Sequence, residues 1–312
     1  MEKYLVTGGA GFIGSHLAEY LVKSGNSVRI LDNFLTGKEE NLSSFRDGVE
    51  LVRGDIRDLG ACKKSVKGVD YVLHQAALPS VPRSIEDPIL TNAINVEGTL
   101  HILIAARDEG VQKVVFASSS SVYGDNPELP KREAAEGYPL SPYAVTKIAG
   151  EKYCRIFSQT YGLPVVCLRY FNVFGPRQDP HSQYAAVIPN FITRLLKGES
   201  PVIFGDGEQS RDFTYVANVV EANILAAKAS SVSGTVFNIG CGSRTTVNSL
   251  AVTLARIMKV DIPPHYEKQR PGDILHSFAD ISKAEKELKY EPPVRLEEGL
   301  ALTAAWFAGR RA

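Results

Sequence analysis

The chain has 312 residues, and its 35 lysines and arginines balance 35 aspartates and glutamates, so that the formal net charge is zero. This balance gives no electrostatic indication of nucleic acid or of an anionic membrane surface as a partner. The length is sufficient for one large domain or for two lobes with a buried core.

Neither targeting segments nor metal motifs are evident. The predicted fold begins at Tyr4, which leaves no room for a signal peptide, and no apolar stretch approaches the length needed to span a bilayer. Cys62, Cys154, Cys167 and Cys241 are scattered, without a CxxC pair or a spacing typical of metal ligands. We therefore expect free thiols, no metal site and a cytoplasmic protein.

The N-terminal half alternates short apolar stretches with helical segments. Predicted strands cover Lys3–Thr7, Ser27–Leu31, Glu50–Arg53, Val69–His74, Lys113–Ser118 and Val165–Tyr170, and predicted helices cover Ser15–Ser24, Leu90–Glu109 and Tyr143–Tyr161. This alternation favours a parallel sheet with helices on both faces. Right-handed crossovers then give a doubly wound α/β domain of the Rossmann type.

The C-terminal half has a different character, because beyond residue 172 the alternation weakens and prolines become frequent. We predict that residues 1–172 form a dinucleotide-binding domain. Residues 173–312 are expected to form mainly a smaller lobe over the carboxyl ends of the strands, where such sheets bind ligands. Two apolar segments, Phe213–Val220 and Val236–Gly240, are expected to return to the first domain.

A glycine-rich loop follows the first predicted strand, and it contains both GxxGxxG, from Gly8, and GxGxxG, from Gly9. Glycines allow a tight turn and a close approach of the backbone to a pyrophosphate, and the next helix presents free N–H groups to it. The motif alone could be an ordinary turn, but its place between a strand and a helix indicates a dinucleotide site. The expected contacts in the loop are Gly8, Gly11, Phe12, Ile13 and Gly14.

Asp32 ends the second predicted strand, 18 residues after Gly14. Its carboxylate suits the ribose hydroxyls and would repel a 2′-phosphate, and Lys38 is the first cation nearby, so the pattern favours NAD over NADP. Asp55 and Ile56, after the third strand, are candidates to border the adenine. Asp55 is equally consistent with a turn residue or a helix cap.

Tyr143 and Lys147 lie four residues apart, so a helix here would place the phenol and the ammonium on one face. A free tyrosine, with a pKa near ~10, is a poor base at neutral pH. A neighbouring cation favours the phenolate, and a serine hydroxyl, available in the run Ser118–Ser121, can hydrogen-bond the oxygen as its charge changes. Together with the glycine loop, this pattern indicates an acid/base beside a hydride carrier.

The sequence resembles the extended short-chain dehydrogenase/reductase family, and within it the nucleotide-sugar 4-epimerases. Matching segments follow the family's order over nearly the whole chain: Thr7–Gly14, His74–Ala77, Asn95–Gly98, Ser118–Gly124, Tyr143–Lys147, Arg169–Gly175, Ser210–Tyr215 and Arg270–Asp273. The resemblance implies bound NAD, with Tyr143 as the acid/base and Lys147 bridging the phenol and the nicotinamide ribose. It also implies cofactor contacts at Asn33, Ala76, Ala77, Asn95, Ser118 and Phe171.

The resemblance implies that one serine of the run is the third catalytic group, and the run also bears on the reaction. The family pattern Ser/Thr-x-x-x-Tyr-Gly, counted back from Tyr123, selects Ser119, with Ser118 nearer the cofactor and Ser120 and Ser121 toward the substrate. The run could instead form a helix cap or a turn. Related 4,6-dehydratases carry an Asp-Glu pair at the last two positions, and related decarboxylases carry a glutamate at the second. Without these carboxylates, the simplest chemistry is oxidation and re-reduction at one carbon, which is epimerisation.

The resemblance further implies a pocket for a UDP-sugar. Arg211 and Arg270 suit a diphosphate, because guanidinium groups match phosphate oxygens, although either would also fit a surface ion pair. Arg83 is expected to reach the sugar or the phosphates, or else to lie on a solvated face. The other expected contacts, besides Tyr143 and the serines, are Asn172, Val187, Pro189, Asp273 and Ser277.

Two features bear on which sugar is bound. The segment Arg169–Gly175 departs from the Asn-Pro-x-Gly-Ala ending typical of UDP-galactose 4-epimerases. Ser277 stands where epimerases restricted to plain hexoses have tyrosine, and a small side chain leaves space for a 2-acetamido group. The resemblance therefore implies interconversion of UDP-GlcNAc and UDP-GalNAc, with UDP-Glc and UDP-Gal as further substrates. The alternatives are a narrow UDP-glucose/UDP-galactose 4-epimerase, a nucleotide-sugar dehydrogenase or reductase, and a non-catalytic regulatory relative.

Two predicted helices bear on assembly. Leu90–Glu109 and Tyr143–Tyr161 resemble the helices that pair in the family's dimers as an intersubunit four-helix bundle. We therefore expect a homodimer, although the apolar faces of these helices could instead pack only against their own sheet.

Overall fold

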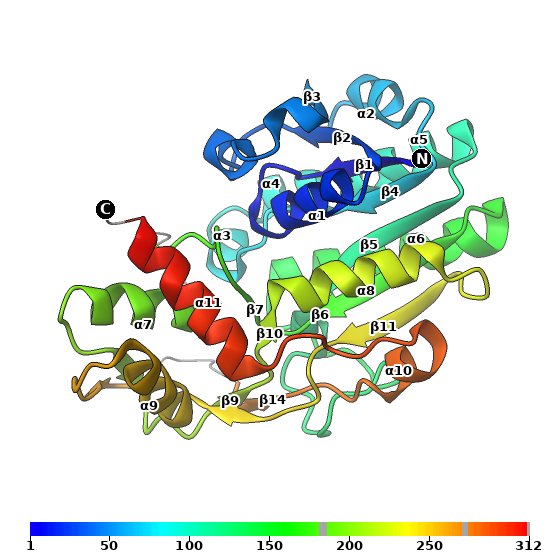
Figure 1. Cartoon of the computed structure of the whole chain (residues 1–312). Coiled ribbons are helices and arrows are strands. Elements are labelled where there is room, and N and C mark those ends of the chain that lie inside the picture. Colours follow the sequence, from blue (N-terminus) through cyan, green and yellow to red (C-terminus); the bar gives the residue numbers. More distant parts are fainter. Residues whose placement is uncertain (181–185, 270–273, 311–312) are drawn as a thin grey trace.

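The structure is a computed structural model that describes residues 1–180, 186–269 and 274–310. Its central sheet has seven parallel strands in the order β11-β6-β5-β4-β1-β2-β3 (Figure 1). The strands are β1 (Lys3–Thr7), β2 (Ser27–Asp32), β3 (Val49–Arg53), β4 (Tyr71–His74), β5 (Lys113–Ser119), β6 (Val165–Tyr170) and β11 (Thr235–Ile239). This order confirms the predicted doubly wound sheet. From β1, the chain adds β2 and β3 on one side and then β4, β5, β6 and β11 on the other, so the strand order reverses between β1 and β4.

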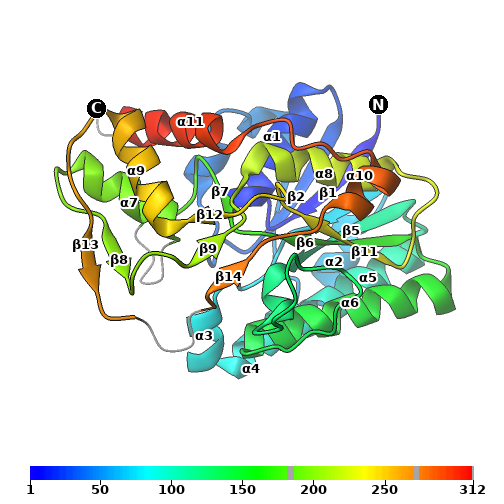
Figure 2. The same cartoon turned by 90° about the horizontal axis from the view of Figure 1, so that it is seen from below.

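Helices cover both faces of the sheet, as Figure 2 shows. On one face lie α1 (Phe12–Lys23), α8 (Val216–Lys228) and α10 (Ser282–Leu288); on the other lie α2 (Leu59–Val66), α5 (Gly98–Glu109) and α6 (Pro142–Tyr161). Because successive side chains of a strand point to opposite faces, Val6 and Ile30 join one core whereas Leu5 and Leu31 join the other. The central residues of most strands are therefore apolar on both faces, as the sequence shows.

A smaller lobe, with its own core, follows β6. Its helices are α7 (Val187–Leu196), α9 (Val247–Met258) and α11 (Leu296–Gly309), which pack around Phe174, Phe213 and Leu250. In Figure 1 the lobe lies at the lower left, beyond the carboxyl end of β6. Its short strands are β7 (Val173–Phe174), β8 (Val202–Phe204), β9 (Ser210–Arg211), β10 (Thr214–Tyr215), β12 (Thr245–Thr246), β13 (His265–Glu267) and β14 (His276–Ser277).

The chain passes between the two parts repeatedly. Phe213 packs in the core of the lobe, whereas Val219 and Val220, on α8, pack in a core of the sheet. The next strand, β11, pairs in parallel with β6 at the edge of the sheet. We therefore propose two interleaved parts: residues 1–172 with returning segments near 213–240, and the remainder of 173–312.

The helix before β5 is longer and less regular than predicted. It runs from α4 (Pro88–Asn92) through a π-helix (Ala93–Glu97) into α5. Pro88–Glu109 has 22 residues, and its most apolar 18-residue window has a mean hydropathy of 1.3. By length and composition it could cross a membrane, contrary to the expectation that no stretch approaches this length. Half of its most apolar window is buried inside the protein, and a core helix has the same composition.

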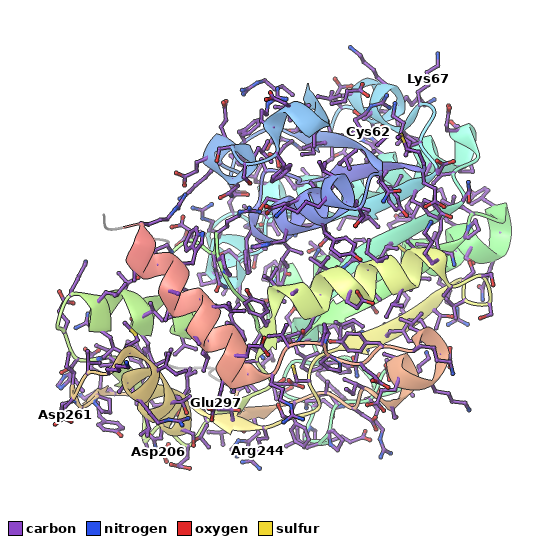
Figure 3. All side chains as sticks on the ribbon, in the orientation of Figure 1. Cys62, Lys67, Asp206, Arg244, Asp261 and Glu297 are labelled. Carbon is purple, nitrogen blue, oxygen red and sulfur yellow. The ribbon has the colours of Figure 1, made fainter. Side chains whose placement is uncertain are left out.

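The four cysteines have free thiols in the described part of the chain, and three of them are buried. Cys62, for example, is a buried residue of α2, whereas Arg244 and Glu297 lie on the outside of the lobe (Figure 3). Within the described residues, no group of three or more His, Cys, Asp or Glu side chains converges as metal ligands would.

Candidate active site

The glycine loop closes tightly at the carboxyl end of β1. Gly8 has a φ of 67°, and the amide of Gly11 donates to the Gly8 carbonyl oxygen at 3.0 Å. A Cβ atom on Gly14 would lie 2.1 Å from that oxygen, and one on Gly8 would lie 2.8 Å from the backbone of Ala76. Only glycine fits these two positions. Because no side chains cover the loop there, its backbone is accessible to a ligand.

Helix α1 begins directly after this loop, with Gly11 as its N-cap, three residues before the predicted start. Its first turn consists of uncharged residues, including Phe12, Ile13 and Gly14. First-turn amides have no intrahelical partner, and the helix dipole adds positive charge there. The loop lies where the strand order reverses, so this arrangement fits the pyrophosphate of NAD.

Asp32, at the end of β2, is buried beside the glycine loop. Its Oδ2 accepts a hydrogen bond from the Ala10 amide at 2.9 Å, and its Oδ1 accepts one from the Phe34 amide at 2.8 Å. Burial raises the pKa of Asp32, and the two amides oppose this rise. Lys38, the cation noted in the sequence, pairs with Asp179 at 3.6 Å. An oriented carboxylate in this place suits the ribose hydroxyls of NAD.

The predicted adenine-side residues lie at the ends of neighbouring strands. Asn33 Nδ2 donates to Asp55 Oδ2 at 2.8 Å. Asp55 also accepts from the Arg57 amide at 2.8 Å, and the Arg57 guanidinium lowers the pKa of Asp55 to about 2. Asp58 is the N-cap of α2, so Asp55 is a turn residue and not a helix cap. Ile56 is buried.

Asn95 connects the segment after β4 to α6 through hydrogen bonds. It lies in the π-helix, with its Oδ1 accepting from the Leu78 amide at 2.7 Å and its Nδ2 donating to Thr146 Oγ1 at 3.1 Å. Such π-helical turns are frequent at functional sites. Asn95 thereby holds the segment of Ala76 and Ala77, both half-buried, against α6.

Two other expected cofactor contacts have interior side chains. Ser118 is 3% exposed, and its hydroxyl donates to the buried carboxylate of Glu151. Phe171 is fully buried and packs against the ring of Tyr123. The buried positions of these two side chains do not favour contact with NAD. The contacts of Ser118 and Phe171 with NAD therefore stay predictions.

Tyr143 and Lys147 lie on consecutive turns of α6, as their spacing predicts. Lys147 is 4% exposed, its Nζ donates to the Ala117 carbonyl oxygen at 2.7 Å, and it lies 5.8 Å from the centroid of the Tyr143 ring. Burial lowers the pKa of Lys147 to about 8, against the opposing effects of Cys154, Glu151 and Cys167. The ammonium thus lies on the same side of α6 as the phenol ring, where a cation would favour the phenolate.

Ser119 ends β5 beside the phenol. Its Oγ accepts from the Ser121 amide at 3.2 Å, so it caps the short 3₁₀ helix Ser120–Tyr123. Burial raises the pKa of Tyr143, whereas a hydrogen bond with the Ser119 side chain lowers it. Ser119 therefore combines the cap with a contact to the proposed base. Within the described residues, Ser121 Oγ is enclosed without a hydrogen-bond partner.

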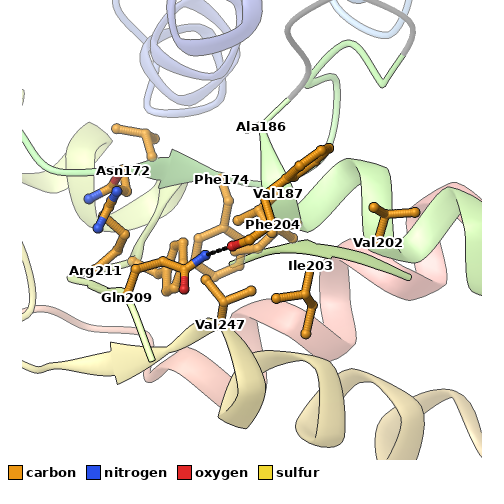
Figure 4. A pocket seen from close by; sticks show the side chains of 13 residues that line it. Asn172, Phe174, Ala186, Val187, Val202, Ile203, Phe204, Gln209, Arg211 and Val247 are labelled. Carbon is orange, nitrogen blue, oxygen red and sulfur yellow. Dashed lines mark hydrogen bonds between the residues drawn. The ribbon is translucent and has the colours of Figure 1, made fainter. Parts of the chain in front are cut away.

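A pocket of about 260 Å³ lies in the lobe (Figure 4). Asn172 and Arg211 lie together at one side, and most of the remaining wall is apolar. Gln209 Nε2 donates to the Phe204 carbonyl oxygen at 2.7 Å. An apolar cavity with a few oriented polar groups is typical of ligand sites. The lining is Asn172, Val173, Phe174, Ala186, Val187, Ile188, Val202, Ile203, Phe204, Gln209, Arg211, Phe213 and Val247.

Arg211 and Ser277 are direct neighbours, because their Cα atoms pair across β9 and β14. Arg211 donates to the carbonyl oxygens of Ser210 and Leu275 at 3.0 and 3.1 Å. Asn172, with a φ of 32°, donates from its Nδ2 to the Asp212 carbonyl oxygen at 3.1 Å. The structure therefore brings Asn172, Arg211 and Ser277 to one region.

The remaining predicted substrate residues are placed differently. Val187 lines the pocket, whereas Pro189 is buried within α7 and is not part of the described lining. Arg83 is exposed on α3 (Val81–Glu86). Arg270 and Asp273 lie outside the described residues.

Two buried carboxylates at the site were missed from the sequence. Asp212 accepts from the amides of Cys241, Gly242 and Ala279 at 2.9, 3.0 and 3.2 Å, and burial raises its pKa to about 6. Glu151 pairs with a buried arginine. The available signal for Glu151 was its position four residues after Lys147, on the same face of the helix.

Comparisons with known proteins bear on this site. Residues 4–240 match the NAD dependent epimerase/dehydratase family. The putative UDP-glucose 4-epimerase of Methanocaldococcus jannaschii is 42% identical over 304 residues, which are 97% of each chain.

Two solved structures are also similar. The UDP-N-acetylglucosamine 4-epimerase from Methanobrevibacter ruminantium M1, in complex with UDP-N-acetylmuramic acid, is 45% identical, with a TM-score of 0.95 over 99% of both chains. The UDP-glucose 4-epimerase from Thermotoga maritima, with UDP-glucose, is 40% identical, with a TM-score of 0.94 over 99% of this chain and 100% of that one.

These matches confirm the resemblance inferred from the motifs. They agree with a parallel sheet whose glycine loop lies at the reversal of strand order and with a tyrosine and a lysine on one helix. The chain belongs to the NAD dependent epimerase/dehydratase family, and within it to the NAD-dependent UDP-sugar 4-epimerases, which are isomerases.

Proposed function

We propose that this isomerase interconverts UDP-GlcNAc and UDP-GalNAc, and that it also acts on UDP-Glc and UDP-Gal. The observation that carries the choice of sugar is the small side chain of Ser277, which is not itself part of the described lining but pairs in register with Arg211 of the pocket wall. A small residue there leaves space for a 2-acetamido group. The similar protein that was solved with UDP-N-acetylmuramic acid, a 2-acetamido sugar, supports this choice.

NAD, held by the glycine loop and Asp32, supplies the hydride acceptor and donor for C4 of the sugar. Tyr143, as phenolate, accepts the proton of the 4-hydroxyl and returns it when the opposite configuration forms. Ser119 hydrogen-bonds the phenol as its charge changes, and the Lys147 ammonium favours the phenolate. Each turnover leaves the redox state unchanged.

The oxidised sugar ring must rotate within the site while its nucleotide remains bound, so that the hydride can return to the opposite face. We assign the pocket to the nucleotide end of the substrate, with Phe204 and Val187 in the apolar wall and Asn172 and Arg211 on the polar side. A guanidinium is suited to phosphate oxygens. Roles for Arg83, Arg270 and Asp273 in the same pocket remain predictions.

The choice of sugar is tested by Ser277→Tyr. We expect kcat/KM for UDP-GlcNAc to fall by roughly 10- to 100-fold, because the ring occupies the acetamido space. The value for UDP-Glc should change by less than about 3-fold, since that sugar lacks the group. Chromatographic assays of both pairs measure this, with Ser277→Ala as the matched control that preserves both activities. Equal losses on both pairs would remove the basis for this substrate.

The reaction class is tested by turnover without added cofactor. An epimerase regenerates its NAD in every cycle, so the purified protein should convert UDP-GlcNAc to UDP-GalNAc without added NAD(H). A strict requirement for stoichiometric NAD or NADH would instead identify a dehydrogenase or a reductase.

We further propose a cytoplasmic homodimer that pairs through α5 and α6. These helices pack beside each other, and exposed apolar side chains on α6 include Val145 at 53% and Ile156 at 49% exposure. Apolar residues in such a pattern fit a helical interface. Light scattering of the purified protein tests the proposal, and a monomeric mass at working concentrations would contradict it.

A further inference from the structure

A buried ionic cluster lies one helical turn from Lys147. Glu151 is 7% exposed and accepts hydrogen bonds from Ser118 Oγ at 2.5 Å and from Arg169 Nε and Nη2 at 2.8 and 2.7 Å. Arg169 is itself 8% exposed, and its guanidinium lies 4.7 Å from the centroid of the Tyr123 ring. Buried charges are tolerated when they are paired and hydrogen-bonded in this way. Ser118, Glu151 and Arg169 are called the ionic cluster below.

The ionic cluster joins three elements around the proposed catalytic groups. Glu151 belongs to α6, Arg169 to β6, and Ser118 to β5, where it pairs in register with Arg169. Ser118 directly precedes Ser119, and Ala117, one residue earlier, accepts the hydrogen bond from Lys147. A shift of α6 along β5 would break these bonds together. The cluster therefore fixes the position of Lys147 relative to Ser119.

The ionic cluster also determines the charge around Lys147. The titratable groups that act on this ammonium or face it are Tyr143, Glu151 and Cys154 on α6, Cys167 on β6 and His74 on β4. Burial lowers the pKa of His74 to about 3, so this ring is neutral at physiological pH. The pKa of the Cys167 thiol is raised well above its ordinary value. Among these groups, the Glu151 carboxylate supplies the negative charge that favours the Lys147 ammonium. The positive charge of Arg169, paired with Glu151, weakens this effect.

We propose that Glu151 and Arg169 are positioning residues for the epimerase reaction: the ionic cluster fixes Lys147 against the strand end that carries Ser119, and its carboxylate, Glu151, favours the ammonium form of the buried lysine while Arg169 limits this effect. This inference rests on the proposed roles of Tyr143, Lys147 and Ser119. An ion pair with a purely structural role would affect stability without affecting the ionisation of Lys147.

Two single variants separate these readings, because they change the charge near Lys147 in opposite directions. Glu151→Gln keeps the size of the side chain but leaves Arg169 unopposed, so the alkaline limb of kcat, set by loss of the Lys147 proton, should move to lower pH by about half a unit or more. Arg169→Met leaves the carboxylate near Lys147, so the same limb should move to higher pH. In both variants, kcat near neutral pH should fall about 10-fold while KM changes by less than about 3-fold.

Arg29→Met is the matched control. Arg29 is a buried arginine, distant in the fold, that donates to the carbonyl oxygens of Ser65 and Lys67 at 2.7 and 2.8 Å. Its replacement should lower the melting temperature and leave kcat and the alkaline limb in place. Alkaline limbs that stay unchanged, or that move in the same direction in both Glu151→Gln and Arg169→Met, would overturn the proposal.

If Glu151→Gln and Arg169→Met do not fold, Ser118→Ala tests the positioning role of the ionic cluster instead. It removes one donor to Glu151 without changing any charge, and we expect kcat to fall roughly 3- to 10-fold with KM and NAD content unchanged. An unchanged kcat would overturn the proposal. Failure of the proposed function is distinguishable, because then the unmodified protein itself would not epimerise any UDP-sugar.

Discussion

Replacement of Tyr143 by phenylalanine is expected to lower kcat for UDP-sugar epimerisation about 10³-fold, within the range typical of general acid–base groups. The phenol oxygen is the proposed proton acceptor; it interacts with the Ser119 side chain, and the Lys147 ammonium lies 5.8 Å from the centroid of the Tyr143 ring. Phenylalanine keeps the ring in α6 and removes only this oxygen. Initial rates with UDP-GlcNAc and UDP-Glc, measured by chromatography, give the size of the loss.

The matched control for this variant is Tyr20→Phe, which removes a phenol oxygen from a side chain that is 41% exposed on α1. It should retain full activity. The Tyr143→Phe protein should keep its melting temperature and its bound NAD, because Tyr143 is proposed to act on the proton of the substrate. Normal turnover by Tyr143→Phe would refute the acid/base assignment and with it the proposed mechanism.

Gly14→Ala should reduce NAD affinity at least about 100-fold, a difference of about 2.7 kcal/mol. The added Cβ would lie 2.1 Å from the Gly8 carbonyl oxygen, 2.8 Å from the Gly8 carbonyl carbon and 2.9 Å from Gly9 Cα. All three are backbone atoms, so the loop and the start of α1 must separate, and the first-turn amides move away from the pyrophosphate site. The NAD content of the purified protein and a titration with NAD measure the effect.

Gly309→Ala is the control for this glycine, because a Cβ there would meet none of the described atoms within 4 Å. It should bind NAD as the unmodified protein does. A Gly14→Ala protein that folds and retains full NAD content would show that the dinucleotide does not depend on this loop.

Local signals explain why much of the fold was predictable. The strands are short apolar segments next to glycines, and Tyr143–Tyr161 is the predicted extent of a helix that begins one residue earlier, at Pro142. The start of α1 was placed three residues too late, because Phe12, Ile13 and Gly14 look like loop in the sequence. They become helical because Gly14 packs on Gly8, a contact between backbones that side-chain patterns do not encode.

The sequence by itself determined the parallel sheet, the glycine loop with Asp32, and the helical spacing of Tyr143 and Lys147, because each depends on neighbouring residues or on strand periodicity. Only the tertiary structure decided that Ser118 bonds Glu151, that Glu151 pairs with Arg169, and that Arg211 lies beside Ser277. These partners are up to 66 residues apart in the chain. Their approach depends on the order of strands and on burial of charge, which no local pattern records.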